Sequence, residues 1–303
     1  MSVLSKPYFH DEKAAFAKLE SVLWPEGPVC PHCGSNGKHY DLAKTRIGLR
    51  KCAEKTCRKQ FTVRVGTVFE SSHIPLHKWF QAVHLMCSSK KGISSHQLHR
   101  VLEVTYKTAW FMTHRIREAM RAGELAPIGG AGGSGIVEAD ETFIGNKKGA
   151  PKRRGYGHKH AVLSLVERSG EVRSFHVADT KTETVITIVN DNIEREARVM
   201  TDDAGQYRNR LTDFAEHGVV NHTANEYVRG DVHTNTVEGY FSIFKRGMKG
   251  VYQHCSEKHL HRYLAEFDFR YNNRSAKGVE DEQRAVRAME GAKGRRLTYQ
   301  TAC

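Results

Sequence analysis

The 303-residue sequence lacks the long apolar runs of a membrane protein. Its most apolar stretches, such as residues 161–166, fall far short of the ~18–20 residues needed to cross a bilayer. Residues 1–10 also lack the apolar centre of a secretory signal. We therefore expect a cytoplasmic, nucleoid-associated protein in a reducing compartment, where disulfides are rare.

Acidic residues are few relative to basic ones. The chain has 34 Asp and Glu against 47 Lys and Arg, a formal net charge of +13, with a pI near 9.4. This imbalance favours a polyanionic partner such as DNA, because neutralised phosphates release counterions, although a basic pI alone is a weak signal. Hydrophobic residues make up 39%, which predicts a normal soluble core.

The cysteines are few, seven in all, and four of them form two close pairs. Cys30 and Cys33 make a C-x2-C pair, and Cys52 and Cys57 make a C-x4-C pair. This spacing predicts a tetrahedral zinc site, and four protein ligands make it structural rather than catalytic. The alternative is four unrelated free thiols. The remaining cysteines stand alone and are expected to be structural or incidental: Cys87, Cys255 and Cys303.

Changes in composition divide the chain into four expected parts. We assign residues 1–72 to an N-terminal helix and zinc ribbon, and 73–128 to a helical module. A glycine-rich linker opens an α/β domain at 129–275, and 276–303 form a C-terminal tail with a short helix near 280–290. Strands near 136–144, 161–167, 173–178 and 198–201, with helices at 180–193, 234–249 and 256–272, predict a mixed sheet flanked by helices.

Residues 93–121 are compatible with a helix-turn-helix. A short helix, a break near residues 104–105 and a longer helix follow one another. The longer helix carries Lys107, His114, Arg115 and Arg117 and could enter a major groove. A helical connector with a solvated basic face explains the same residues equally well.

Three acidic residues occupy unusual positions. Asp140 lies within a strand pattern, where aspartate is disfavoured. Asp202 closes a strand, and Glu238 lies near the start of a helix whose polar stripe also carries Lys245. Each has a simpler explanation, since Asp202 could belong to a turn, Glu238 to a helix cap with Asn235, and Lys245 could be solvated. Together they predict a cation site.

A run of basic residues follows Asp140. It contains no acid and is interspersed with Gly and Pro, so we expect a loop that grips the DNA backbone. A mobile solubilising loop is the alternative. The basic residues of this run are Lys147, Lys148, Lys152, Arg153, Arg154 and Lys159.

Several short motifs are distributed along residues 10–275. They are WPEG at 24–27, CPHCGS at 30–35, GTVFE at 66–70, IPLHKW at 74–79, EADET at 138–142, TD at 201–202, HTNTVEG at 233–239 and RYNNR at 270–274. In combination they resemble the ISXO-like group of zinc-ribbon insertion-sequence transposases, and the similarity covers nearly the whole chain.

The resemblance implies a ribonuclease-H-like catalytic domain of the DDE type. Its three acids fall on Asp140, Asp202 and Glu238, which would hold two Mg2+ or Mn2+ ions for phosphoryl transfer. Lys245 falls where the family carries a basic residue that contacts DNA phosphate. Neighbouring residues could replace the three acids: Glu141, Asp203 and Asn235.

The implied activity is DNA transposition. The protein would bind the terminal inverted repeats of its element, cut there and join the ends to target DNA, as a homodimer or higher oligomer on DNA. Two other functions remain open. One is a zinc-ribbon DNA-binding regulator with an inactive core, and the other is a ribonuclease-H-like nuclease without strand transfer.

Overall fold

The computed structural model describes residues 2–123, 125–130, 134–151 and 154–298, and it packs as two compact units. One unit comprises Met1–Arg121 with Arg274–Cys303, and the other comprises Ala122–Asn273. Within the described residues, every helix is too short or too polar to traverse a lipid bilayer.

The first unit contains a small sheet and five α-helices in its described residues. Its elements are η1 (Val3–Ser5), η2 (Pro7–Phe9), α1 (Glu12–Leu23), β1 (His39–Asp41), β2 (Arg50–Cys52), β3 (Gln60–Phe61), α2 (Leu76–Ser88), α3 (Ser95–Leu102), α4 (Tyr106–Met120), η5 (Ser275–Lys277) and α8 (Asp281–Glu290).

The second unit contains the larger sheet and its covering helices. Its elements are β4 (Ile136–Ile144), β5 (His160–Glu167), β6 (Val172–Val177), α5 (Thr182–Asn192), β7 (Arg198–Asp202), β8 (Glu216–Val220), η3 (His222–Ala224), β9 (Val228–Arg229), β10 (Val232–His233), α6 (Asn235–Gly247), the π-helix η4 (Met248–Tyr252) and α7 (Glu257–Asn272).

The small sheet follows α1 and has the antiparallel order β1-β2-β3. Asp11 caps α1 by accepting a hydrogen bond from the backbone N–H of Ala14 at 2.7 Å. The sheet buries little besides Phe61, which packs with Trp24 and the cysteines. So little apolar surface cannot hold three short strands together, and the ribbon needs a further cross-link.

The helices α2, α3 and α4 follow the ribbon. Ser94 caps α3 and Thr105 caps α4, each accepting a backbone hydrogen bond from the first turn of its helix. Glu103 takes a left-handed conformation between them, with φ of 51°, and ends α3. The two helices predicted between residues 93 and 121 are therefore present, and the break falls at 103–105.

The C-terminal segment returns to this first unit. α8 packs against α2, and Arg284 donates a buried hydrogen bond to the backbone oxygen of Cys87 at 2.7 Å. The helix expected near residues 280–290 is present. The segment expected as a separate tail thus contributes to the core of the N-terminal unit.

The large sheet is mixed and has five strands in the order β6-β5-β4-β7-β8. β4, β7 and β8 run parallel, while β5 and β6 are antiparallel to their neighbours. The predicted α/β fold with a mixed sheet flanked by helices is confirmed. Strand β8 and the β9–β10 hairpin were not expected from the sequence, because they are short and lack a clear alternating pattern.

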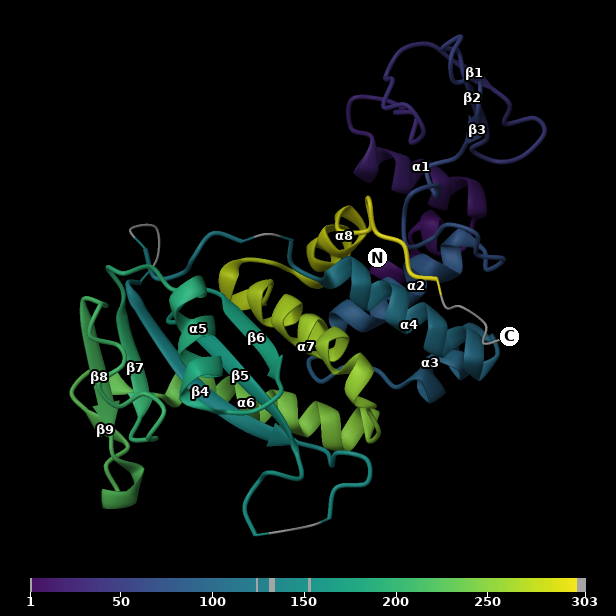
Figure 1. The fold of residues 1–303 in the computed structure, drawn as a ribbon. Coiled ribbons are helices and arrows are strands. Elements are labelled where there is room, and N and C mark those ends of the chain that lie inside the picture. Colours follow the sequence, from purple (N-terminus) through teal and green to yellow (C-terminus); the bar gives the residue numbers. More distant parts are fainter. Residues whose placement is uncertain (1, 124, 131–133, 152–153, 299–303) are drawn as a thin grey trace. The chain divides into compact units, whose positions relative to one another are not determined.

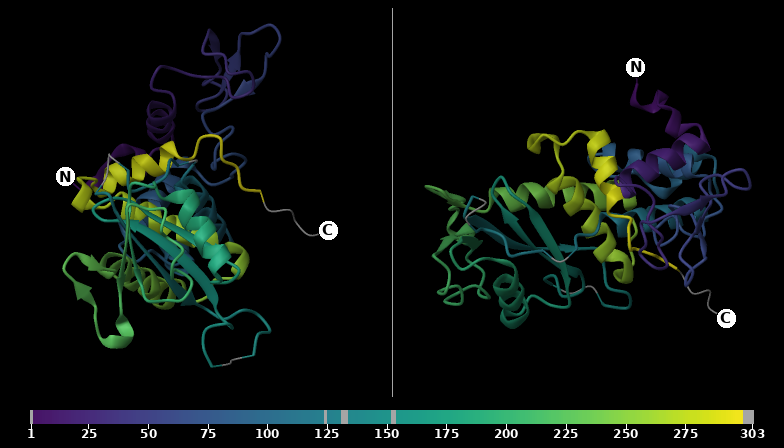
Figure 2. Two further views of the ribbon diagram at one scale, coloured as in Figure 1. Left: turned by 60° about the vertical axis from the view of Figure 1, so that its left-hand side comes forward. Right: turned by 90° about the horizontal axis from the view of Figure 1, so that it is seen from above.

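Helices cover both faces of this sheet, α5 on one and α6 with α7 on the other (Figures 1 and 2). Alternate residues of β4 divide between these faces. Val137 and Ala139 pack with α5, so we call that side the α5 face. Ile144 packs with α6 and α7, which define the α6/α7 face. Glu138 and Asp140 share the side of Ile144.

Candidate active site

Asp140 and Asp202 lie on the adjacent parallel strands β4 and β7. The parallel register pairs Glu138 of β4 with Met200 of β7. Continued by two residues, that register sets Asp140 level with Asp202, with both side chains on the α6/α7 face. Asp202 is the last residue of β7 and accepts a hydrogen bond from the backbone N–H of Ala204 at 3.1 Å.

Glu238 reaches the same face from the first turn of α6. The buried carboxylate of Glu138 fixes that helix to β4. It accepts backbone hydrogen bonds from Thr236 at 2.7 Å and Val237 at 3.0 Å, which are unpaired donors at the helix N-terminus. The helix turn that carries Glu238 is therefore hydrogen-bonded to β4, the strand of Asp140.

Arg168 neutralises the charge of Glu138. Its Nε lies 2.7 Å from Glu138 Oε1, and Glu138 is fully buried. Arg168 also donates to the backbone oxygen of His233, just before α6. The Glu138 carboxylate thus has two backbone donors and a cationic partner, as a buried charge requires, and we call this arrangement the Glu138 clamp. Sequence reasoning missed the role of Glu138, which depends on contacts 98 residues away.

The acids strongly influence one another. Burial, together with the charges of Asp202, Glu141 and Glu238, raises the pKa of Asp140 to about 8. Burial also raises the pKa of Asp202. Mutually repelling, buried carboxylates favour either a proton or a cation between them.

No closed cation cage of the three acids is present in the described chain. The acids are not among the groups whose ligand atoms all lie within 4.8 Å of one another. Glu238 remains exposed, and its Oε1 lies 3.9 Å from His222 Nε2. His222 also lowers the pKa of Asp202 through its charge. It thus lies near two of the three acids, a position that no motif indicated.

The three residues named above as possible replacements for the catalytic acids occupy different positions. Glu141 belongs to the α5 face, where it accepts hydrogen bonds from Tyr207 at 2.5 Å and Gln206 at 2.8 Å. Burial raises its pKa to about 7. Asn235 is the exposed first residue of α6, and Asp203 follows β7. Because Glu141 faces away from α6, Asp140 is the better placed of the two.

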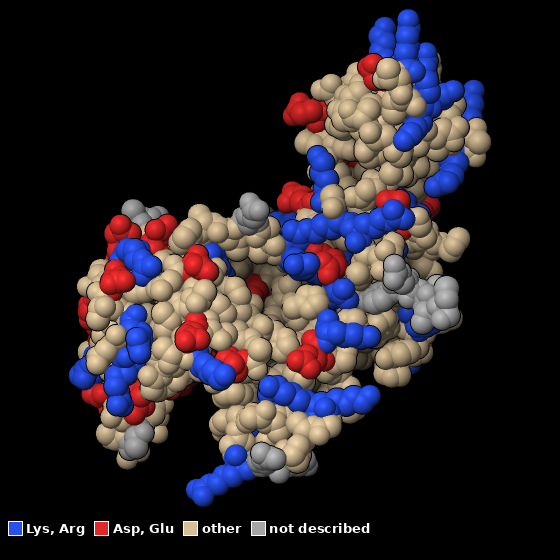
Figure 3. Space-filling model, in the orientation of Figure 1, with Lys and Arg blue, Asp and Glu red and all other residues tan. Residues whose placement is uncertain are grey.

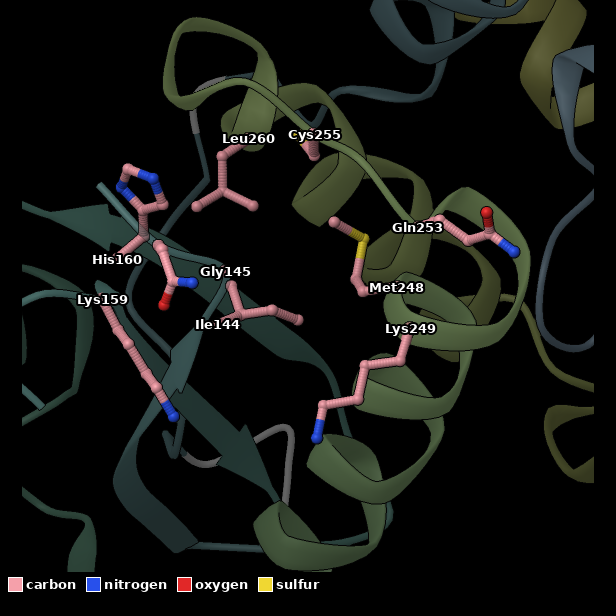
Figure 4. A pocket seen from close by; sticks show the side chains of 10 residues that line it. Ile144, Gly145, Lys159, His160, Met248, Lys249, Gln253, Cys255 and Leu260 are labelled. Carbon is pink, nitrogen blue, oxygen red and sulfur yellow. The ribbon is translucent and has the colours of Figure 1, made fainter. Parts of the chain in front are cut away.

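Basic side chains approach the acids from α6 and the strand ends. Lys245 is half-buried, and burial lowers its pKa, while Asp140 and Glu238 act in the opposite direction. Its amino group lies 5.9 Å from the ring centroid of Phe241. Lys159 and Lys249 also lower the pKa of Lys245 through their positive charges. They extend from opposite walls of a neighbouring pocket (Figure 4).

The basic loop after β4 is only partly described. Lys147 and Lys159 are half-buried at its two ends, while Lys148 and Arg154 are exposed. The backbone N–H of Lys147 bonds to the oxygen of His158 at 2.8 Å, which closes the base of the loop. The other two expected DNA contacts lie outside the described residues: Lys152 and Arg153.

The ribbon cysteines converge on one point. The Sγ atoms of Cys30 and Cys57 are 3.8 Å apart, and those of Cys33 and Cys52 are 3.7 Å apart. All four lie within 4.8 Å of one another. Sulfurs bound tetrahedrally to zinc at ~2.3 Å would be about 3.8 Å apart, whereas a disulfide is ~2.05 Å long. The quartet fits zinc.

Basic side chains surround this ribbon. Figure 3 shows Lys and Arg gathered at its outer edge, at the upper right of that view. Asp41 and Glu54 are the exposed acids among them. The exposed basic residues between positions 38 and 59 are Lys38, Lys44, Arg46, Lys55, Arg58 and Lys59.

The basic residues expected on a recognition helix are mostly buried. His114, Arg115 and Arg117 are at most 5% exposed. Arg115 donates to the backbone oxygens of Val68 at 3.0 Å and Glu70 at 2.8 Å, so it anchors the loop before α2. Only Lys107, of the four basic residues named on this helix, is exposed. The burial of His114, Arg115 and Arg117 fits neither of the two open interpretations, a groove-entering helix or a solvated basic face, at those three positions.

Comparisons with known proteins agree on the family. Residues 133–272 match the ISXO2-like transposase domain, and residues 10–60 match the transposase zinc-ribbon domain. An uncharacterized protein in transposable element ISH50 of Halobacterium salinarum is 29% identical over 280 residues, covering 86% of this chain and 91% of the relative. The chain therefore carries an ISXO2-like transposase domain behind a transposase zinc-ribbon domain.

Proposed function

We propose that this transposase cuts the ends of its own element and joins them to target DNA, with Asp140, Asp202 and Glu238 as its catalytic acids. One observation carries the proposal. The register of β4 and β7 aligns two aspartates on one face, and the Glu138 clamp brings the helix of Glu238 to that same face.

The donor set fits hard divalent cations. Three carboxylates and no thiol or imidazole among the proposed ligands match the oxygen preference of Mg2+ and Mn2+. Asp140, whose pKa is raised to about 8 by burial and by nearby carboxylates, needs a positive charge to ionise fully near neutral pH. When bound, such ions would activate an attacking oxygen and stabilise a leaving oxygen at phosphorus.

The protein residues position the acids and the DNA. Asp140 and Asp202 are held by the central strands, and Glu138 with Arg168 holds the first turn of α6. Lys245, on the same helix as Glu238, would contact a phosphate beside the acids. Lys148 and Arg154 are exposed and free to follow the DNA backbone further along the loop.

The ribbon would supply DNA binding. We propose that Cys30, Cys33, Cys52 and Cys57 bind one structural zinc ion, which supports the exposed basic residues around them. Residues 1–72 would thus form an end-binding module, and residues 129–275 the catalytic domain. Pairing of two element ends would require at least two copies of the chain.

A plasmid assay tests this function. The substrate is a supercoiled plasmid with a marker between the two DNA segments that flank this coding sequence in its host. With Mg2+, we expect cuts at both segment ends and joined products in a second plasmid. Cuts without joined products would indicate a nuclease, and binding without cuts would indicate a regulator; either result would overturn the proposal.

A further inference from the structure

A second cluster of metal-binding side chains lies at the end of the α6/α7 face. His160 is the first residue of β5, and His176 lies near the end of β6. His176 pairs with Val162, so the two histidines are diagonal neighbours on one face of adjacent strands. Glu257, the first residue of α7, completes the group.

The three ligand atoms are close enough to share one ion. They all lie within 4.8 Å of one another. Glu257 Oε1 is 3.8 Å from His160 Nδ1 and 3.9 Å from His176 Nε2. Ligands at ~2.1 Å from a tetrahedral ion are about 3.4 Å apart, so shifts of about half an ångström would close the site.

Both imidazoles have unsatisfied nitrogens. His160 is 5% exposed, and neither its Nδ1 nor His176 Nε2 has a hydrogen-bond partner among the described residues. Leaving a buried polar nitrogen unpaired is costly. The carboxylate oxygen of Glu257 is too far from either nitrogen to form a hydrogen bond with it, so both nitrogens remain without a hydrogen-bond partner.

We propose that His160, His176 and Glu257 bind one transition-metal ion of the zinc class. Two imidazoles and one carboxylate suit Zn2+, Co2+ or Ni2+ better than Mg2+. The remaining position would be taken by water. This site is distinct from the three acids, because Ile144, opposite His160, lies four residues beyond Asp140 on β4, about 13 Å along the strand.

The ion would cross-link the start of β5, the end of β6 and the start of α7 at the base of the basic loop. His158 and Lys159 precede His160 directly, and the His158 backbone oxygen closes the loop base with Lys147. His160 also lines the pocket from which Lys159 and Lys249 extend (Figure 4). The metal would therefore hold Lys159, one residue before His160, in place.

The helix dipole opposes a cation here, but only weakly. Glu257 lies in the first turn of α7, where the unpaired backbone N–H groups disfavour a cation. The negative carboxylate of Glu257, at that same helix end, offsets this opposition.

Zinc stoichiometry of the full chain tests the site. Metal-stripped protein is reloaded with Zn2+, desalted and measured by mass spectrometry of the metal. Wild type should hold two zinc ions per chain, one in the ribbon and one here. Glu257→Gln, at a side chain that is 58% exposed, leaves folding intact and isolates the second ion. His158→Ala, a histidine outside the cluster, is the matched control.

Competition with a chelator measures the Kd of the more weakly bound of the two zinc ions. We expect Glu257→Gln and His176→Ala to raise the Kd of the second ion by about tenfold or more, with His158→Ala unchanged. A single zinc ion in wild type, or an unchanged Kd in Glu257→Gln, would overturn the proposal. Circular dichroism of each variant confirms that the ion, and not the fold, was lost.

Discussion

The carboxylate of Glu138 accepts a hydrogen bond from the backbone N–H of Thr236 at 2.7 Å and thereby ties strand β4 to the first turn of α6. Asp140 lies two residues after Glu138, and Glu238 lies two residues after Thr236. The buried carboxylate of Glu138 thus links the two backbone segments that carry two of the proposed catalytic acids.

The first prediction concerns this positioning role. Glu138→Ala removes the buried acceptor of Arg168 Nε and of two backbone N–H groups of α6, and should lower the free energy of unfolding by about 3–5 kcal/mol. DNA cleavage per folded molecule should fall as well, because α6 loses its anchor. Thermal unfolding and a cleavage assay at a temperature where both proteins are folded measure the two effects.

Glu266→Ala is the matched control for Glu138→Ala. Glu266 is fully buried and pairs with Arg270 within α7, away from the proposed acids. This change should lower stability while leaving cleavage per folded molecule unchanged. If both variants lose cleavage in proportion to their stability, Glu138 has no positioning role.

A second prediction separates catalysis from binding. Asp140→Asn, Asp202→Asn and Glu238→Gln should each abolish cleavage while element ends are still bound, because the ribbon is untouched. Glu141→Gln should retain cleavage, since that side chain bonds to Tyr207 and Gln206 on the α5 face. Full cleavage by any one of the first three variants would refute its assignment.

Zinc removal gives a third prediction. Cys30→Ser should unfold the ribbon, because three short strands with little buried apolar surface depend on the metal. End binding, measured by gel shift, should be lost before any catalytic defect appears. Cys87→Ala, a buried cysteine of α2 outside the quartet, should bind normally. Normal end binding by Cys30→Ser would remove the ribbon from DNA recognition.

The basic loop gives a fourth prediction, measured as salt dependence. Lys148→Ala should reduce the slope of log K against log salt by about 1, because one phosphate contact releases about one counterion. Lys181, which is 79% exposed at the start of α5, is the matched control, and its replacement by Ala should leave the slope unchanged. Equal slopes for wild type and Lys148→Ala would favour a loop that only solubilises the protein.

The pH dependence of stability gives a fifth prediction. Burial raises the pKa of Asp268 to about 7 even though Tyr240 and Ser174 donate hydrogen bonds to it. A raised carboxyl pKa in the folded state stabilises the protein fully below its unfolded pKa of ~4, and this contribution is lost as pH rises through 7.

Denaturant unfolding between pH 4 and pH 8 measures that effect. Asp268 should contribute a fall of roughly 1 kcal/mol per pH unit between its two pKa values. Asp268→Asn should remove this contribution, and Asp191→Asn, an exposed change on α5, should keep it. An identical pH dependence in wild type and Asp268→Asn would show that Asp268 is ionised in the folded protein.

Local patterns predicted much of this molecule. The spacing of Cys30, Cys33, Cys52 and Cys57 indicated one site because tight turns bring such pairs together. The strand pattern around Asp140 and the helix of Glu238 are present as expected, and the structure places both residues on one face. Each cysteine pair, the strand and the helix depend on residues within a few positions of one another.

Long-range contacts explain what could not be predicted. Arg115 and Arg117 look like surface residues in sequence, yet both are buried, and backbone oxygens of a distant loop accept hydrogen bonds from Arg115. The role of Glu138 depends on donors 98 residues away. The return of α8 to the N-terminal unit likewise requires Arg284 to meet Cys87, at a separation of 197 residues. No local pattern records such pairings.

Iron-directed cleavage of the protein tests the central claim most directly. Fe2+ bound in place of Mg2+ generates hydroxyl radicals with ascorbate and peroxide, and these cut the backbone beside the ion. If Asp140, Asp202 and Glu238 share divalent ions, fragments should end near all three residues. Excess Mg2+ or Asp140→Asn should suppress all three cuts together. Cuts near only one of them, or cuts that Mg2+ does not suppress, would contradict the account.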